Sequence, residues 1–220
     1  MDALTPRRAG IGAAAVLFAI LIVVLGWAIP PRSAIISTDR LGPESGEPVT
    51  HYLERAQKSL QGTDSDGHWA LLSFTEGVTA DRIPEFSGGL RISEIDYHVA
   101  VDRVATPIIS IGVPAGDAVA VASVKSAAAQ MESTPTYDDR STRVKNLVAS
   151  RLGADCPCVV AIVLHGTPAQ LRTLAAHPGV RAVEALPADA SAAVFAVSPL
   201  LPEQLESASP PLDDGPVPGN

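Results

Sequence analysis

Residues 159–186 have the sequence VVAIVLHGTPAQLRTLAAHPGVRAVEAL, and this stretch carries the clearest secondary-structure pattern in the chain. Its apolar start predicts a strand. Thr167 then stands at a helix N-cap, a proline follows at the first helical position, and Gln170 occupies the capping-box position. The Pro-Gly-Val-Arg run at 178–181 ends this helix and leads into a second strand over 182–186. The stretch therefore predicts a strand–helix–strand unit.

A similar pattern occurs earlier in the chain. Residues 69–74 form an apolar run that predicts a strand, and Thr79 caps a short helical stretch that Pro84 limits. Two glycines then turn the chain into a strand over residues 92–101, and a further strand is predicted over 107–113. This first copy therefore predicts the order strand, helix, strand, strand.

The two patterns align at an offset of 90 residues and indicate an internal repeat. The equivalent pairs are Phe74 and Leu164, Gly89 and Gly179, Arg91 and Arg181, and Glu94 and Glu184. We predict a duplicated β-α-β-β unit with halves at 68–114 and 156–200, the second half ending in a strand at 192–197. Apolar residues at helical spacing predict a helical connector at 115–153. The expected fold class is α+β, a ferredoxin-like domain over residues 50–207.

The second copy resembles part of a known protein family. Within residues 159–185, the run Leu-Ala-Ala-His-Pro-Gly-Val-Arg-Ala-Val-Glu at 174–184 is similar to the propeptide inhibitor domains of subtilisin-type proteases. Those domains are ferredoxin-like and share the helix, the Pro-Gly-Val turn and the following Val-Glu strand. The resemblance implies the same fold, and it implies regulation or inhibition of an extracytoplasmic protease as a function.

Residues 9–29 form an uninterrupted run of 21 residues without a charged side chain. As a helix at 1.5 Å per residue the run spans about 31 Å, the thickness of a bilayer core. Trp27 suits the membrane interface, and two prolines directly after the run end the helix. We predict a single-pass membrane helix, with a cleaved signal peptide as the alternative. We expect a cytoplasmic tail at 1–8 and the rest of the chain outside the cytoplasm, as in single-pass envelope membrane proteins of actinobacterial type, which this layout resembles.

Two segments outside the repeat have the composition of connecting or terminal chain. Residues 30–49 are rich in Pro, Gly, Ser and Thr and predict a linker. A short helix is predicted over 51–60, with Thr50 as its N-cap. Residues 208–220 hold four prolines and two glycines and predict a disordered tail.

Charge and motifs narrow the function. The chain has 24 acidic and 16 basic residues, a net charge of −8, and no basic stripe, so nucleic-acid binding is not expected. Cys156 and Cys158 are the only cysteines, and we expect either a disulfide or a pair of thiols, because a zinc site would need more ligands at suitable spacing. No motif for catalysis, a cofactor, a metal ion or a small-molecule substrate is present, and the histidines at 51, 68, 98, 165 and 177 form no ligand pair.

These observations predict a non-enzymatic protein of the bacterial cell envelope. Its partners would be the lipid bilayer, through residues 9–29, and another envelope protein or a second copy of itself. Short strands with free edges offer main-chain groups for such contacts. We therefore expect a membrane-anchored protein-interaction module, with the protease regulator as the alternative.

Overall fold

The computed structural model describes residue 18, residues 39–191 and residues 194–219. The chain divides into two units, Met1–Ile36 and Ser37–Asn220, and the second unit holds the folded domain. The predicted tail at 1–8 and membrane helix at 9–29 lie outside the described residues, apart from Phe18. Among the described residues, no helix is both long and apolar enough to cross a membrane.

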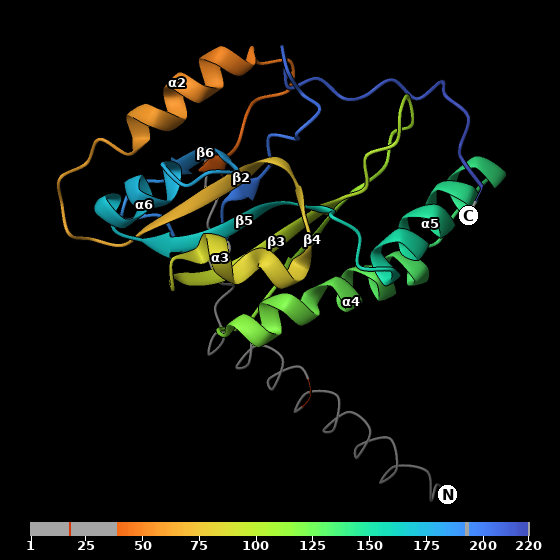
Figure 1. The fold of residues 1–220 in the computed structure, drawn as a ribbon, viewed down its shortest axis with the longest axis horizontal. Helices are drawn as coiled ribbons and strands as arrows, with labels where there is room; N and C mark the ends of the chain where they lie inside the picture. The colour runs from red at the N-terminus through yellow and green to blue at the C-terminus, as the bar shows by residue number, and fades with distance from the viewer. Residues whose placement is uncertain (1–17, 19–38, 192–193, 220) are drawn as a thin grey trace, which may run out of the picture. The chain divides into compact units, whose positions relative to one another are not determined.

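The domain is built on one five-stranded sheet. In chain order the strands are β2 (His68–Val78), β3 (Arg91–His98), β4 (Ile108–Gly112), β5 (Val159–Gly166) and β6 (Val180–Ala185). Across the sheet they lie in the order β4-β3-β5-β2-β6, and every neighbouring pair is antiparallel (Figure 1). The predicted α+β fold class is confirmed.

Two β-α-β units interlock in this sheet. β2 and β3 both run antiparallel to β5, which lies between them, so they are parallel to each other. A 3-10 turn, η1 (Ala80–Arg82), and the short helix α3 (Ile83–Ser87) join them. β5 and β6 flank β2 in the same way and are joined by α6 (Pro168–Ala175). Each predicted half therefore places one of its strands between two strands of the other half.

Local sequence explains how α6 begins and ends. Thr167 accepts a hydrogen bond from the Gln170 amide, and the Gln170 side chain accepts one from the Thr167 amide, which completes the predicted capping box. Gly179 follows the helix with a φ of +90°, a conformation that side-chain-bearing residues rarely adopt. The turn into β6 therefore depends on this glycine.

The connector between the halves forms a helical hairpin, whose members are α4 (Asp117–Ser133) and α5 (Asp139–Gly153). Asp138 caps α5 in a second capping box with Ser141. The strand expected at 192–197 is different: β7 (Ala196–Val197) is a two-residue strand that pairs in parallel with β1 (Arg40–Leu41) in a separate sheet. Main-chain hydrogen bonds to residues 39 and 41 hold this segment, so the described part of the second half has no counterpart of β4, and residues 192–193 lie outside the described residues.

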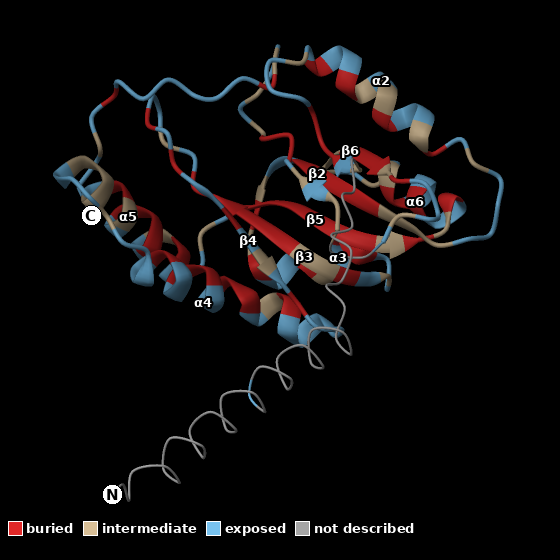
Figure 2. Cartoon of the chain, turned by 180° about the vertical axis from the view of Figure 1, so that it is seen from behind, coloured by how far each residue is buried: buried red, intermediate tan, exposed pale blue. Residues whose placement is uncertain are grey.

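Both faces of the main sheet are covered. Phe74, Ile95 and Ile162 lie on the first face, in the large core shared with α3, α4, α5 and α6. Leu71 and Val163 lie on the second face and pack against β1 and residues near β7. The helix α2 (Val49–Ser59) packs against the β6 end of this face, on the opposite side of the sheet from α4 (Figure 1), and the central strands are buried (Figure 2).

The segment before α2 belongs to the domain from residue 39 onward, although the sequence predicts a linker over 30–49. Leu41 is fully buried in β1. The predicted N-cap, Thr50, lies inside α2, whose N-cap is Pro48. The cause is a tertiary contact: the Val49 amide donates to the Glu206 carbonyl at 2.9 Å, so a distant segment fixes the start of the helix two residues earlier than predicted.

The C-terminal segment is also ordered by specific contacts, whereas its composition predicts a disordered tail over 208–220. Asp213 forms an ion pair with Arg140 of α5 at 2.6 Å, and Asp214 forms one with Arg103. Residues 213–215 therefore contact the β3–β4 loop and α5 (Figure 1), while residue 208 pairs with residues 46 and 47 before α2. Prolines and glycines alone do not reveal such contacts, because the cationic partners are distant in sequence.

A double variant tests this attachment. In Asp213→Ala with Asp214→Ala, we expect a protease that cleaves after leucine to cut at the exposed Leu212 several-fold faster than in the wild type, since cleavage needs a locally detached segment. The readout is the loss of a C-terminal tag from the full-length chain over time, with Asp189→Ala as the control. Equal cleavage rates in all three proteins would show that the ion pairs do not hold the segment.

Candidate functional site

The strand β4 forms one edge of the sheet. It pairs with β3 on one side, and no other strand among the described residues pairs with its outer edge. The Val113 amide, directly after the strand, donates to the Ser93 carbonyl at 2.8 Å. Because antiparallel pairs alternate between bonded and non-bonded positions, residues 109 and 111 also turn their main-chain groups toward β3. The N–H and C=O groups of Ile108, Ser110 and Gly112 therefore point outward.

The outer edge of β4 is uncharged and accessible. Its sequence is Ile-Ile-Ser-Ile-Gly, and the Ile108 side chain is 40% exposed, whereas Ile109 is buried in the core. Ser110 and Gly112 are exposed as well. Protective features of edge strands, such as a lysine or a proline inside the strand, are absent from these five residues. The edge therefore has the properties of a surface that accepts an added strand.

A buried acid lies directly beside this edge. Asp96 of β3 is fully buried, and its Oδ1 accepts a hydrogen bond from the Ser110 hydroxyl at 2.6 Å. Its Oδ2 is buried and has no hydrogen-bond partner among the described residues. Burial raises the pKa of Asp96 to about 7, the bond from Ser110 opposes this rise, and the nearby charge of Glu94 adds to it. The hydrogen bond between Ser110 and Asp96 therefore connects the edge strand β4 to a buried carboxyl group on the second face of the sheet.

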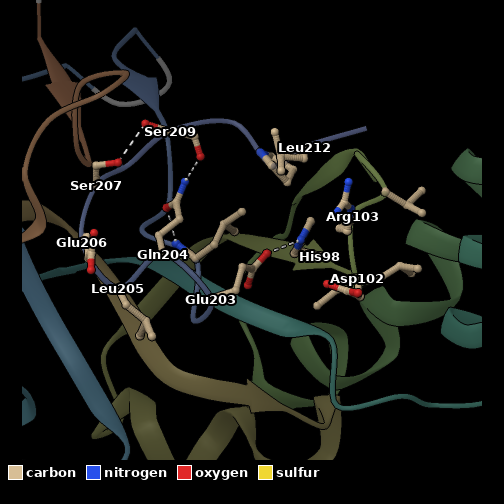
Figure 3. Close-up of a pocket in the computed structure, with 15 residues that line it drawn as sticks. His98, Asp102, Arg103, Glu203, Gln204, Leu205, Glu206, Ser207, Ser209 and Leu212 are labelled. Carbon is tan, nitrogen blue, oxygen red and sulfur yellow. Dashed lines mark hydrogen bonds and ion pairs between the residues drawn. The ribbon is translucent and has the colours of Figure 1, made fainter. Parts of the chain in front are cut away.

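A cleft of about 600 Å³ lies between the end of β3 with its following loop, residues 98–104, and the segment 201–212 (Figure 3). The His98 Nε2 and the Glu203 carboxylate are 2.7 Å apart and point toward each other. Burial raises the pKa of Glu203, but the bond to His98 and the nearby Arg181 outweigh it and leave this pKa lowered. Leu205 and Leu212 line the cleft and are 76% and 66% exposed.

The geometry of His98 favours a structural role. Its second ring nitrogen, Nδ1, lies 3.4 Å from the Thr106 hydroxyl, so both nitrogens face polar partners inside the protein. The ring is 3% exposed. A general base needs a free nitrogen within reach of a substrate proton, and this arrangement does not present one. The pair instead fixes residue 203 against the end of β3.

The two cysteines lie beside this cleft. Cys156 and Cys158 form a disulfide at the entrance of β5, with their Cα atoms 5.2 Å apart. The Cys158 carbonyl accepts a hydrogen bond from the His98 amide at 2.8 Å, and both cysteines line a smaller pocket of about 340 Å³ together with His98 and Glu203. The structure therefore brings the disulfide next to the pair of His98 and Glu203, in which the imidazole is buried and the carboxylate is partly exposed.

The other histidines are separate from one another. His68 contacts Asp64 and the Leu186 carbonyl, His165 packs against Trp69, and His177 packs against Phe86. His51 is exposed on α2. Among the described residues, no group of three or more His, Cys, Asp or Glu side chains is placed to hold a metal ion.

The site residues predicted from sequence did not include Asp96, Ser110 or Glu203. A usable signal existed in β3, whose alternation places Ile95 and Tyr97 in the core and the acids at 94 and 96 on the other face. That pattern normally indicates an exposed face, so burial of Asp96 followed only from the cover that distant segments supply.

Comparison of the chain with protein families, with curated proteins and with solved structures found no match. Within the described residues, two surfaces have functional character: the outer edge of β4 and the cleft of His98 and Glu203.

Proposed function

We propose that this chain is a single-pass, membrane-anchored protein of the bacterial cell envelope whose extracytoplasmic domain binds other protein by strand addition at β4. In this proposal the domain is ferredoxin-like, with two interlocked halves, and it has no enzymatic activity. One observation carries the proposal: the outward main-chain groups of Ile108, Ser110 and Gly112 are accessible, uncharged and unpaired with any described strand. Main-chain hydrogen bonds along such an edge supply affinity, and the alternate side chains supply specificity.

Two further features fit this location and role. The apolar run at 9–29 has the length of a membrane helix, and a disulfide between Cys156 and Cys158 suits an oxidising compartment outside the cytoplasm. β4 also has no counterpart among the described strands of the second half. An additional edge strand beyond the interlocked core is a place where an interaction surface can change without disturbing that core.

The protease-regulator alternative has less support. A regulator of that kind would lay the open face of its sheet against the enzyme. Here the second face is covered, and Leu71, Ala161 and Val163 are at most 1% exposed. The second face of the sheet is covered, whereas the outer edge of β4 is accessible to a partner. Strand addition is therefore the better supported mode of binding.

A matched pair of substitutions at Gly112 tests the proposal. A Cβ atom added at this position would meet only the Ser93 carbonyl oxygen, at 3.9 Å, so Gly112→Ala has room, and proline is tolerated on an edge strand where the N–H group faces outward. The alanine variant retains the outward N–H group, whereas proline removes that donor and fills its place with a ring. We expect crosslinked partner, captured from intact cells through a carboxy-terminal tag, to fall about tenfold in Gly112→Pro, since a lost hydrogen bond and a steric clash both oppose strand addition.

The alanine variant serves as the control, because it retains the outward N–H group, and it should capture several-fold more partner than Gly112→Pro. Both variants should retain the wild-type circular dichroism spectrum, because the N–H of residue 112 points away from β3. Equal capture by the two variants would overturn strand addition at β4 as the mode of binding.

A further inference from the structure

The strand β4 is complementary to itself, and we infer that its occupant is a second copy of this chain, paired antiparallel about Ser110. The inference rests on the proposed function and names its partner. A head-to-tail addition, in which β4 of one copy pairs with the β6 edge of the next, leaves another β4 free and continues without closure. An antiparallel pair is closed by a two-fold axis normal to the sheet, and the product is a continuous ten-stranded sheet with five strands from each copy.

The register centred on Ser110 overlaps all five residues of the strand. The outward-facing groups of Ser110 then meet those of the second Ser110, and Ile108 of each copy stands opposite Gly112 of the other. On the core side, Ile109 stands opposite Ile111 of the other copy. No charged side chain lies within either strand, so this register brings no like charges into direct opposition.

The side chains fit this register as well as the main chain does. Ile108 is the one large apolar residue of β4 that is 40% exposed, and it lies on the second face with Ser110 and Gly112. Gly112 has no side chain, and the space at its Cβ position is open, with its nearest atom at 3.9 Å. In the dimer, the exposed Ile108 side chain of each copy therefore covers the open space at Gly112 of the other copy, and the two-fold axis produces this contact twice.

The symmetry also suits two chains in one membrane. A two-fold axis normal to the sheet presents the same sheet face of both copies on the same side, so corresponding points such as residue 39 leave the dimer on one side. Anchoring in a common membrane raises the effective concentration of the two domains for each other. Two domains that pair through only five residues of β4 can therefore form a dimer when both are anchored in one membrane, although the same domains would stay monomeric in dilute solution.

Cysteine crosslinking of the full-length chain in membranes of intact cells tests both the partner and the register. Residues directly opposite in an antiparallel pair have Cα atoms about 4.5–5.5 Å apart, within the range that a disulfide spans. We expect Ser110→Cys to give covalent dimers under mild oxidation. Ile108→Cys alone and Gly112→Cys alone should remain at the background of the wild type, because identical residues four positions out of register are about 13 Å apart.

A mixed pair provides the decisive arm. Chains carrying Ile108→Cys and Gly112→Cys, co-expressed with different tags, should form covalent heterodimers with a yield at least several-fold above either variant alone. These two positions do not contact Asp96, so the result does not depend on loss of the Ser110 hydroxyl. Equal crosslinking by the single variants and the mixture would overturn the register and with it the two-fold pairing.

The outcomes separate this inference from the proposed function. The first outcome is that no cysteine variant or mixture forms covalent dimers of this chain, while Gly112→Pro captures less of some other protein than the wild type does. This outcome would overturn the second-copy inference and leave strand addition at β4 in place. If none crosslinks and Gly112→Pro captures as much partner as Gly112→Ala, both are overturned. Covalent dimers in the predicted pattern, abolished by an added Gly112→Pro in the Ser110→Cys chain, support both.

Discussion

The Asp96→Asn variant should be more stable than the wild type near pH 8 and about equally stable near pH 4. Asp96 is fully buried in β3, and its Oδ2 has no hydrogen-bond partner among the described residues. Asparagine has nearly the same shape, retains an oxygen that accepts from the Ser110 hydroxyl, and carries no charge at any pH. The difference between the two proteins therefore reports the cost of placing a carboxylate at this position.

The sign follows from the direction of the pKa shift. Burial raises the pKa of Asp96 from 3.8 in the unfolded chain to about 7 in the folded protein. Between these values the unfolded chain has released the proton while the folded protein retains it, so the free energy of unfolding falls as the pH rises. The stabilisation is fully present below about pH 4 and is lost by about pH 7, with a total on the order of 4 kcal/mol. Asp96→Asn should lack this dependence.

Urea unfolding of the full-length chain at several pH values measures the effect. Glu94→Gln is the matched control, since Glu94 lies on the same strand and face, its pKa is also raised by burial, and it is only partly buried. We expect Glu94→Gln to change the pH profile much less than Asp96→Asn does. Parallel profiles for wild type and Asp96→Asn would contradict an ionisation of Asp96 in this range.

The parts of the fold that were predictable from sequence are those set by local pattern. The capping box of Thr167 and Gln170, the turn at Gly179 and the apolar runs of β2 and β5 are each encoded within a few residues. Their repetition at an offset of 90 residues also indicated two strand–helix–strand units. The interlocking of the two units, seen in the strand order β4-β3-β5-β2-β6, did not follow from these local patterns.

The parts that local pattern did not predict depend on contacts between distant segments. The composition near residue 41 predicts a linker, but this segment pairs with β7 in the fold. The composition of residues 208–219 predicts disorder, but Arg103 and Arg140 form ion pairs with Asp214 and Asp213 of this segment. The same cover buries the second face of the sheet, so Asp96 could not be recognised as a buried acid from its strand alone. The outer edge of β4 depends likewise on the strand order, which places nothing beyond it among the described residues.

Loss of the Glu184 carboxylate should produce the second large effect, because this buried side chain attaches α2 and β1 to the sheet. Its carboxylate accepts from the Gly42 amide at 2.6 Å and forms an ion pair with Arg55 of α2. Burial raises the pKa of Glu184, and the bonds from Gly42 and Arg55 counteract that rise. In Glu184→Ala the buried Gly42 amide loses its acceptor and Arg55 loses its partner, so we expect a loss of about 2–4 kcal/mol in the free energy of unfolding.

The control at Glu47 separates the buried contact from a peripheral one. Glu47 also pairs with Arg55, at 2.9 Å, but this pair lies at the margin of the domain, and Glu47→Ala should cost at most about 1 kcal/mol in the free energy of unfolding.

Hydrogen exchange distinguishes a local from a global effect: amides of α2 should lose protection in Glu184→Ala while those of β5 retain it. Such selective loss would mean that Glu184 holds a separable cover on the second face. Glu94, which aligns with Glu184 at the predicted offset of 90 residues, takes part in no ion pair among the described residues, so the two positions have different structural roles. Equal losses of stability in Glu184→Ala and Glu47→Ala would contradict this role, because they would place the attachment of α2 in Arg55 and not in the buried carboxylate.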